Sequence, residues 1–555
     1  MYAVVLLLAV IVALYIYGTR TYGYWKKRGV KHDRPIPFLG NGARNFLMLK
    51  NFCDTSGELY RKYPRERVVG FYRGTEPELI IRDPELAKRI LITDFSRFYP
   101  RGLLPQREVV EPLLRNLFFA DGDVWRLLRQ RMTPAFSGGK VRAMFPLITE
   151  RAECMQARAL RLAAADDRGR VDVKDLLTRY STDFIGACGF GLDVGALRDE
   201  DSIVVKMSSK IFEHGVKECI VNLLKSSFPW AFSRVNSMAR VEGDIKYIVK
   251  EVQKQRNYRA SGRNDFIDLM LECKAEGTIV GKSMERTTPS GEPEVATLEM
   301  DDELMAAQVF VFFAAGFETS SSATSTTLNE LAHNPAVQAR AQEEIDHVLA
   351  GHGGKLSYDA VKEMTYLEWT LKESMRVFPS PGFLVRRCAR SFTVDGLTID
   401  KGIKVYIPLT ALHNDPQYFD NPDEFRPERF DPAHFDPRNK YVYMPFGIGP
   451  RACIGNISVC LSRFHAKTTE PIVMKFCYFL TGKRGCKGVK MRKFVQIKLV
   501  PKIHNRWRRA SPTSRYRLLI SLSIRRGTMT NDVLRYFRLF YTLIMYNSLL
   551  STSSM

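Results

Sequence analysis

The ten residues Phe446-Gly-Ile-Gly-Pro-Arg-Ala-Cys-Ile-Gly455 surround a single cysteine, Cys453, with glycines on both sides. Glycine permits left-handed backbone torsions and a close approach of the main chain. Such a loop can direct several backbone N–H groups at one sulfur atom. We therefore expect the sulfur of Cys453 to be a thiolate, the form that binds metals.

The alternative is an inert, buried cysteine in a loop rich in glycine and proline. The ten residues, however, resemble the haem-binding loop of the cytochrome P450 superfamily, Phe-x-x-Gly-x-Arg-x-Cys-x-Gly, at every fixed position. The resemblance implies that Cys453 is the axial iron ligand of a haem, whose thiolate favours O–O bond cleavage. It also implies that the loop holds the cofactor through Phe446, Gly447, Gly449, Arg451 and Gly455.

Positive charge is concentrated at the end of the chain. The 555 residues have a formal net charge of +23, of which residues 456–555 contribute +18 and the rest only +5. A nucleic-acid partner, the usual implication of a basic chain, would have to bind this last segment alone, and we expect none. Ten scattered cysteines without a Cys-x-x-Cys pair indicate reduced thiols in a cytosolic environment.

Residues 1–19 carry no charge and approach the ~20 residues that span a bilayer. A cleaved signal peptide is the alternative, but its basic start and small-residue cleavage site are absent. Basic residues follow the apolar run, from Arg20 to Arg34, which places that flank in the cytoplasm. We therefore expect a membrane anchor and basic flank over residues 1–34, and a catalytic domain over 35–470 that faces the cytoplasm from the endoplasmic reticulum membrane.

Trp125 and Arg129 lie four residues apart in a helix predicted to begin at Asp121 and to stop at Pro134, so they share one face. A solvated basic helix is the alternative, because Arg126 and Arg131 are also present. The resemblance implies that Trp125 and Arg129 hydrogen-bond a haem propionate, for which an indole N–H and a guanidinium are suitable donors. Residues 141–270 are predicted to form amphipathic helices, and 274–300 a surface loop.

A long buried helix is predicted from Asp301 to Asn334, interrupted by Ala315-Gly-Phe-Glu-Thr319. A glycine inside a helix costs about 1 kcal/mol, and a buried carboxylate costs more unless it is partnered. A helix end that turns toward solvent is the alternative interpretation. The resemblance implies that Gly316 leaves room for dioxygen and that Glu318 and Thr319 deliver the protons for O–O cleavage.

Glu373 and Arg376 lie three apart on a helix predicted over residues 358–377. The resemblance implies that they form a buried structural network behind the haem with Arg429, from the run Phe425-Arg-Pro-Glu-Arg-Phe430. The intervening alternating runs, with a turn at Asp395-Gly396, predict a small antiparallel sheet. We therefore expect a mainly α fold class with a minor antiparallel β region. The resemblance implies a cytochrome P450 fold, preceded by one N-terminal membrane anchor.

The family pattern is lost after Gly455. The family has Arg-Phe soon after this glycine, whereas Arg463-Phe464 come later, as if six residues had been inserted. The apolar residues still keep helical spacing, so a helix that ends before Pro471 is possible. The basic segment 471–555 has two interpretations. It either lies on an anionic membrane or results from a misread exon boundary or shifted frame, and the abrupt change in composition favours the second.

The chain resembles insect microsomal members of the family that oxidise plant toxins and insecticides. The resemblance implies a haem-thiolate monooxygenase that inserts one atom of O2 into small lipophilic substrates. Electrons would come from an NADPH-dependent flavoprotein reductase, since the chain has no nucleotide-binding glycine motif, and basic residues near Arg126, Arg131 and Lys140 are expected to meet it.

Three alternatives remain open. The first is a biosynthetic hydroxylase of a hormone or fatty acid with the same fold. The second is a non-oxygenating isomerase, which would usually lack the pair Glu318-Thr319. The third is an inactive remnant whose basic tail binds anionic surfaces.

Overall fold

The computed structural model describes residues 2–46, 49–103, 111–166, 171–199, 239–262 and 265–456, together with 202, 204, 205, 207 and 211. The predicted helix after Gly455 and the basic segment 471–555 lie outside these residues.

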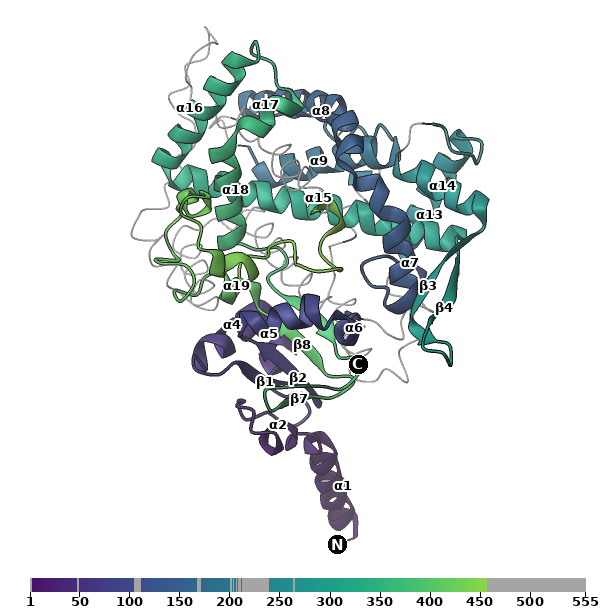
Figure 1. The fold of residues 1–555 in the computed structure, drawn as a ribbon, viewed down its shortest axis with the longest axis vertical. Helices are drawn as coiled ribbons and strands as arrows, with labels where there is room; N and C mark the ends of the chain where they lie inside the picture. Colours follow the sequence, from purple (N-terminus) through teal and green to yellow (C-terminus); the bar gives the residue numbers. More distant parts are fainter. Residues whose placement is uncertain are drawn as a thin grey trace.

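Helices make up most of the molecule, a mixed sheet forms a smaller layer beside them, and α1 projects away from the body (Figure 1). The helices are α1 (Tyr2–Thr19), α2 (Tyr24–Lys27), α3 (Ala43–Phe46), α4 (Phe52–Lys62), α5 (Pro84–Lys88), α6 (Phe95–Phe98), α7 (Gly122–Met132), α8 (Gly138–Ala165), α9 (Val173–Ile185), α13 (Ala239–Gln255), α14 (Phe266–Glu276), α15 (Asp302–His333), α16 (Pro335–Gly351), α17 (Tyr358–Glu363), α18 (Thr365–Val377) and α19 (Leu409–Leu412). The strands are β1 (Val68–Arg73), β2 (Glu76–Ile81), β3 (Thr278–Thr287), β4 (Pro293–Glu299), β5 (Leu384–Arg387), β6 (Phe392–Val394), β7 (Leu397–Ile399) and β8 (Lys404–Ile407). The prediction of a mainly helical chain with minor antiparallel β structure is confirmed.

The largest sheet pairs strands from two distant parts of the sequence, residues 68–81 and residues 384–407. Its strand order is β1-β2-β8-β5, with β1 antiparallel to β2 and β5 antiparallel to β8. One pairing, between β2 and β8, is parallel and places Leu79 opposite Val405. The smaller hairpin β6–β7 turns at Asp395 and Gly396, as predicted, with both residues at positive φ.

Two local predictions are wrong. Residues 278–299, predicted as a surface loop, form the hairpin β3–β4, because Ile279 and Ser283 turn inward and Gly281 packs against Leu127 of α7. The helix predicted over 358–377 is broken between α17 and α18. The carboxylate of Glu344 accepts the backbone N–H groups of Tyr366 and Leu367 at 2.8 and 2.9 Å, so it stabilises a new helix start there.

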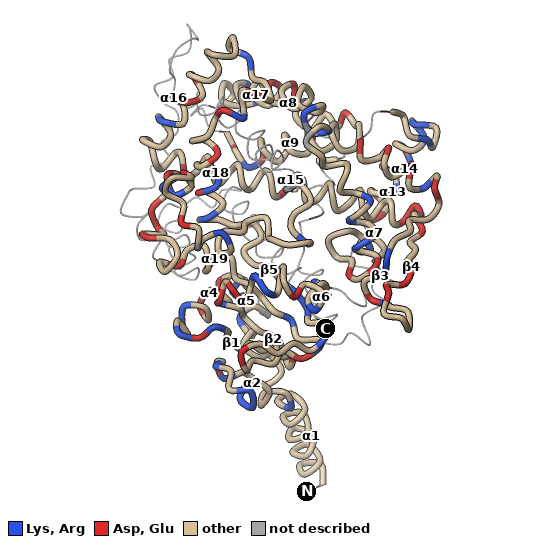
Figure 2. The backbone as a smooth tube through the Cα atoms, viewed as in Figure 1, with Lys and Arg blue, Asp and Glu red and all other residues tan. Residues whose placement is uncertain are grey.

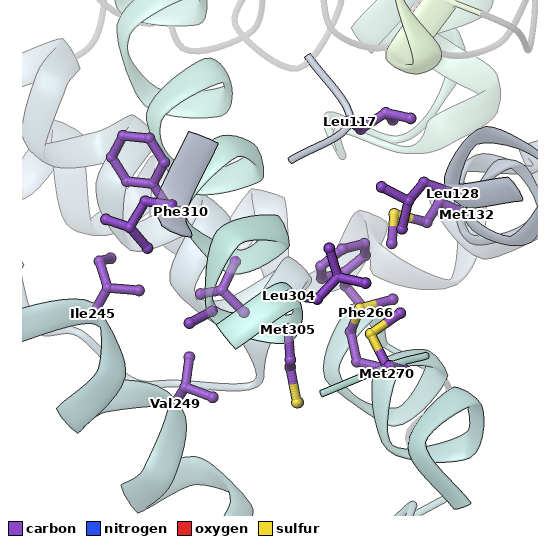
Figure 3. Packing of buried hydrophobic residues seen from close by; sticks show 14 of the residues in the cluster. Leu117, Leu128, Met132, Ile245, Val249, Phe266, Met270, Leu304, Met305 and Phe310 are labelled. Carbon is purple, nitrogen blue, oxygen red and sulfur yellow. The ribbon is translucent and has the colours of Figure 1, made fainter. Parts of the chain in front are cut away.

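The central helix α15 is the main element of the core. Its apolar side chains, including Leu304, Met305 and Phe310, pack against α7, α13 and α14 (Figure 3). Among the described residues, two helices are long and apolar enough to cross a membrane. Of the most apolar stretch of α15, 61% is buried inside the protein, against only 6% of that of α1. α15 is therefore a helix of the protein core. Its N-cap is Asp301, whose side chain accepts the backbone N–H of Leu304.

The N-terminal helix α1 carries no charged residue along its length (Figure 2). It meets the body at Gly18, where a side chain would collide with the ring of Phe38. Just beyond it, Trp25 is fully buried and donates its indole N–H to the carbonyl of Phe71 in β1 at 3.1 Å. The end of α1 is thus attached to the sheet.

Candidate active site

The loop around Cys453 has the backbone that its glycines predict. Gly447 and Gly449 have φ values of +70° and +76°, in the left-handed region. A Cβ atom on Gly449 would lie 2.0 Å from the carbonyl oxygen of Leu91, so no side chain fits there. The backbone N–H of Cys453 donates to the carbonyl of Phe446 at 2.9 Å and closes the loop, while the Cys453 side chain is exposed. The thiol is therefore accessible to an external ligand.

The cysteine loop borders the hydrophobic cluster to which α15 contributes. Ile454, the neighbour of Cys453, packs against the hydrophobic cluster that contains Phe313 and Phe317 of α15. Gly455 ends the loop close to the sulfur, because a Cβ atom there would lie 3.7 Å from the Cys453 Sγ.

Helix α7 brings Trp125 and Arg129 to this site. Trp125 is buried, and the guanidinium of Arg451 lies over its ring, 4.3 Å from the centroid. Burial lowers the pKa of Arg129, and the nearby Cys453 opposes that shift. The contact of Arg451 with Trp125 shows that α7 and the cysteine loop face each other.

Asp121 lies directly before α7, where the sequence predicts the helix to begin. Its carboxylate does not cap α7. It accepts the backbone N–H groups of Arg101 and Gly102 at 2.8 and 3.0 Å, and the Nη2 of Arg451 at 3.0 Å. Asp121 therefore ties the loop after α6, the start of α7 and the cysteine loop together.

Two arginines of the site were not predicted. Arg101 donates to the carbonyl of Phe118 at 2.9 Å, and Arg386 is buried in β5. Their electrostatic influence reaches Arg451, since both charges lower its pKa. The sequence offered only a weak signal, namely an arginine within the apolar strand run Leu384-Val-Arg-Arg387 and the unexplained Pro100-Arg-Gly102.

This arginine cluster, which we define as Arg101, Arg129, Arg386 and Arg451, has unused hydrogen-bond donors. Within the described part of the chain, the buried Nε and Nη1 of Arg451 and the Nε of Arg386 have no hydrogen-bond partner. Burial lowers the pKa of Arg386 to about 9, helped by the charge of Arg101, and lowers that of Arg451 far below its ordinary value. Buried cations with unmet donors require anions. Two propionates of a haem supply charge of this sign, so the residues present fit that cofactor.

An iron bound by protein side chains alone has no comparable site. Among the described residues, no three His, Cys, Asp or Glu side chains gather in a way that would hold a metal ion. A haem iron needs only one axial ligand from the protein, because the porphyrin supplies the others. The exposed Cys453 is suited to that single position.

The interrupted segment of α15 remains helical. The Thr319 Oγ1 donates to the carbonyl of Ala315 at 2.6 Å, and Ala315 is exposed. Gly316 is explained by packing, because a Cβ atom there would lie 2.4 Å from the Cδ1 of Ile185 in α9. Glu318 is partnered by Lys174, whose Nζ lies 3.1 Å from its Oε1. Residues 315–319 therefore continue the helix without a break and pack closely against α9.

Glu373, Arg376 and Arg429 lie together in the core. Glu373 and Arg376 form a two-pronged ion pair, with distances of 2.8 and 2.9 Å, and both side chains are 0% exposed. Arg429 approaches the same carboxylate at 3.3 Å. Arg376 also donates to the carbonyls of His413 and Pro422 at 3.0 and 2.7 Å. This network attaches α18 to the segment that leads into the cysteine loop.

Comparisons with known proteins agree with this geometry. A sequence model described as "Cytochrome P450" matches residues 31–457. The chain is 36% identical to "Cytochrome P450 6B2" of Helicoverpa armigera over 80% of this chain and 86% of the relative. It is 37% identical to "Cytochrome P450 6a2" of Drosophila melanogaster over 82% of this chain and 90% of that protein. This chain, which carries the cysteine loop and the arginine cluster, belongs to the cytochrome P450 family of haem-thiolate monooxygenases.

Proposed function

We propose that this protein is a microsomal monooxygenase that oxidises small lipophilic foreign compounds such as plant toxins and insecticides. The support for this substrate class is the resemblance to insect microsomal members of the family. The catalytic domain is proposed to comprise residues 35–470.

The single observation that carries the proposed site is the arginine cluster with its unmet donors beside the exposed Cys453. Bound haem supplies the activation of O2, so that one oxygen atom enters the substrate and the other is reduced to water. Cys453 is the proposed axial ligand, in a loop shaped by Phe446, Gly447, Gly449 and Gly455. The propionates are proposed to be held by Trp125, Arg129 and Arg451, with Arg101 and Arg386.

Residues of α15 are proposed to manage protons for the reaction that the bound cofactor would carry out. The Thr319 hydroxyl and the Glu318 carboxylate are the acid–hydroxyl pair proposed to exchange protons here. Ala315 is the exposed residue whose carbonyl fixes the Thr319 hydroxyl. Gly316 permits the close packing of α15 on α9, which keeps this segment in place.

The N-terminal helix is proposed to anchor the protein in the endoplasmic reticulum membrane with the catalytic domain in the cytoplasm. The support is the exposed, uncharged α1 followed by basic residues. This position would give the site access to substrates dissolved in lipid and to a membrane-bound reductase.

An NADPH-dependent flavoprotein reductase is the proposed electron donor. Of the basic residues considered for this contact, Arg131 already pairs with Glu276 at 2.6 Å. Arg126, half-exposed on α7, is the better candidate. A contact between basic and acidic surfaces is screened over roughly 8 Å at physiological ionic strength, so turnover should fall with added salt.

Reconstitution tests the proposed substrate class. The full chain is placed in lipid vesicles with reductase and NADPH, and oxidised products are measured for a panel of insecticides and aromatic plant toxins, with a steroid and a fatty acid as comparison substrates. We expect oxidation of several foreign compounds. Efficient conversion of only the steroid or only the fatty acid would contradict the proposal and favour a biosynthetic hydroxylase.

A further inference from the structure

A lysine of α9 reaches the carboxylate of α15. Lys174 Nζ lies 3.1 Å from Oε1 of Glu318, and it donates to the hydroxyls of Ser321 and Ser322 at 2.8 and 2.9 Å. Ser322 itself donates to the same Oε1 at 3.1 Å. An ammonium group has three donors, and these three contacts use all of them. The cluster is therefore a complete hydrogen-bonded unit.

The position of Lys174 in its helix needs an explanation. It lies in the first turn of α9, where the partial positive charge of the helix end disfavours a cation. The acidic residue of the same turn, Asp175, pairs with Arg179 at 3.1 Å. The N-cap carboxylate, that of Asp172, accepts the backbone N–H of Asp175. The carboxylate that contacts Lys174 is the one on α15.

The contact also determines where the Glu318 carboxylate lies. Consecutive residues of a helix point about 100° apart, so Glu318 and Thr319 cannot face the same side. The Thr319 hydroxyl is held by the Ala315 carbonyl, whereas Glu318 is held on the side of α9. Both Lys174 and Glu318 are about one-fifth exposed, with side-chain values of 22% and 23%, so water can reach the pair.

We propose that Lys174 is a positioning residue that fixes the Glu318 carboxylate for proton delivery and so keeps electron use coupled to product formation. The proposal rests on the proposed role of Glu318 and Thr319. If protons arrive wrongly, an O2 molecule that has received two electrons and two protons leaves as H2O2 instead of oxidising the substrate. The NADPH that supplied those electrons is then consumed without product.

The test compares Lys174→Met, Lys174→Arg, Glu318→Gln and the double variant Lys174→Met/Glu318→Gln in the full, haem-loaded protein with reductase. The matched control is Lys246→Met, which removes a lysine that pairs with Glu303 at the start of α15 at 2.8 Å. The readouts are H2O2 and product formed per NADPH consumed, substrate KM, and the reduced carbon-monoxide spectrum.

We expect Lys174→Met to raise H2O2 per NADPH at least threefold and to lower product formation about tenfold, part of the ~10²–10⁴-fold that positioned proton transfer contributes. KM and the carbon-monoxide spectrum stay within twofold of the parent protein, as do all values for Lys246→Met. Lys174→Arg restores most of the coupling. In the Glu318→Gln background, Lys174→Met has no further effect, because the lysine acts through the carboxylate.

Two results would overturn the proposal. One is an unchanged yield of H2O2 per NADPH in Lys174→Met, and the other is independent, multiplying effects of Lys174→Met and Glu318→Gln.

Urea unfolding of the parent and these variants tests the pair without turnover. Non-additive unfolding equilibria are expected, and additive ones contradict the contact itself. If the parent protein lacks the thiolate spectrum and turnover, the proposed function fails first, and the assignment of this pair to proton delivery fails with it.

Discussion

The arginine cluster is the set of residues that we propose to hold the acidic cofactor. Arg451 could be predicted from the cysteine motif, and the structure adds its contact with Trp125 and its bond to Asp121. Arg386 and Arg101 could not be assigned from sequence, because an isolated arginine gives no information about which charges the fold will bring near it. Arg386 is identified by its burial with an Nε that has no partner among the described residues, and Arg101 by the effect of its charge on the pKa of Arg451.

Substitution of Arg386 tests whether the arginine cluster holds the cofactor. Arg386→Gln removes a buried charge, and a hydrogen bond to a charged group contributes about 1.5–3 kcal/mol, so haem retention should weaken about tenfold to a hundredfold. Transfer of haem to an apoprotein acceptor measures this loss. The exposed Arg390→Gln is the matched control and should behave like the parent. Equal rates of haem transfer from both variants would show that Arg386 does not help to hold the cofactor.

The buried ion pair of Glu373 should be costly to break. Glu373→Gln leaves Arg376 charged in a fully buried position, which costs about 3–5 kcal/mol of unfolding free energy. The exposed pair of Glu428 with Arg340 is a matched control at 2.6 Å, and Glu428→Gln should cost no more than about 1 kcal/mol. Urea unfolding measures both. Similar losses in the two variants would contradict a structural role for the buried network.

Among the elements, those with strong local signals were predicted and those fixed by tertiary contacts were not. The long apolar run that follows Asp301 predicted α15, and the turn residues Asp395-Gly396 predicted the hairpin β6–β7. The hairpin β3–β4 was missed because its stability depends on packing against α7. Its alternation is also obscured, since Val280 and Val295 are exposed whereas Ser283 is buried. The break before α18 depends on Glu344 of another helix, which no local pattern reveals.

The packing of α15 on α9 makes a prediction about Gly316. Gly316→Ala gains about 1 kcal/mol in helix propensity, but its Cβ would overlap Ile185, and such overpacking costs about 1–3 kcal/mol. The net effect should be neutral to destabilising in the parent protein. In an Ile185→Ala background, which lacks both overlapping atoms, Cδ1 and Cγ1, the same change should become stabilising. Thermal unfolding of the four proteins shows whether the sign reverses, and a constant sign would contradict the packing explanation.

At the scale of the whole molecule, α1 stands apart from the body and carries no charge (Figures 1 and 2). The body itself is organised around α15, with the sheet on the side where the chain enters from α1. This arrangement fits a protein held to a membrane at one end.

Deletion of residues 2–19 tests the anchor. The full chain should stay with microsomal membranes in 1 M salt, whereas the deletion variant should move to the supernatant, because charge contacts that remain are screened within about 3 Å. Replacement of Lys26 and Lys27 by glutamine leaves the apolar span intact and serves as the control. A deletion variant that still sediments with membranes at high salt would show that α1 is not the principal attachment.

The reduced carbon-monoxide difference spectrum of the full-length protein tests the central claim most directly. The account predicts a Soret maximum with the red shift of a thiolate ligand, retained in Cys154→Ala and lost in Cys453→Ala. Absence of that red shift in the parent protein, or its survival in Cys453→Ala, would contradict the assignment of Cys453 as the haem ligand.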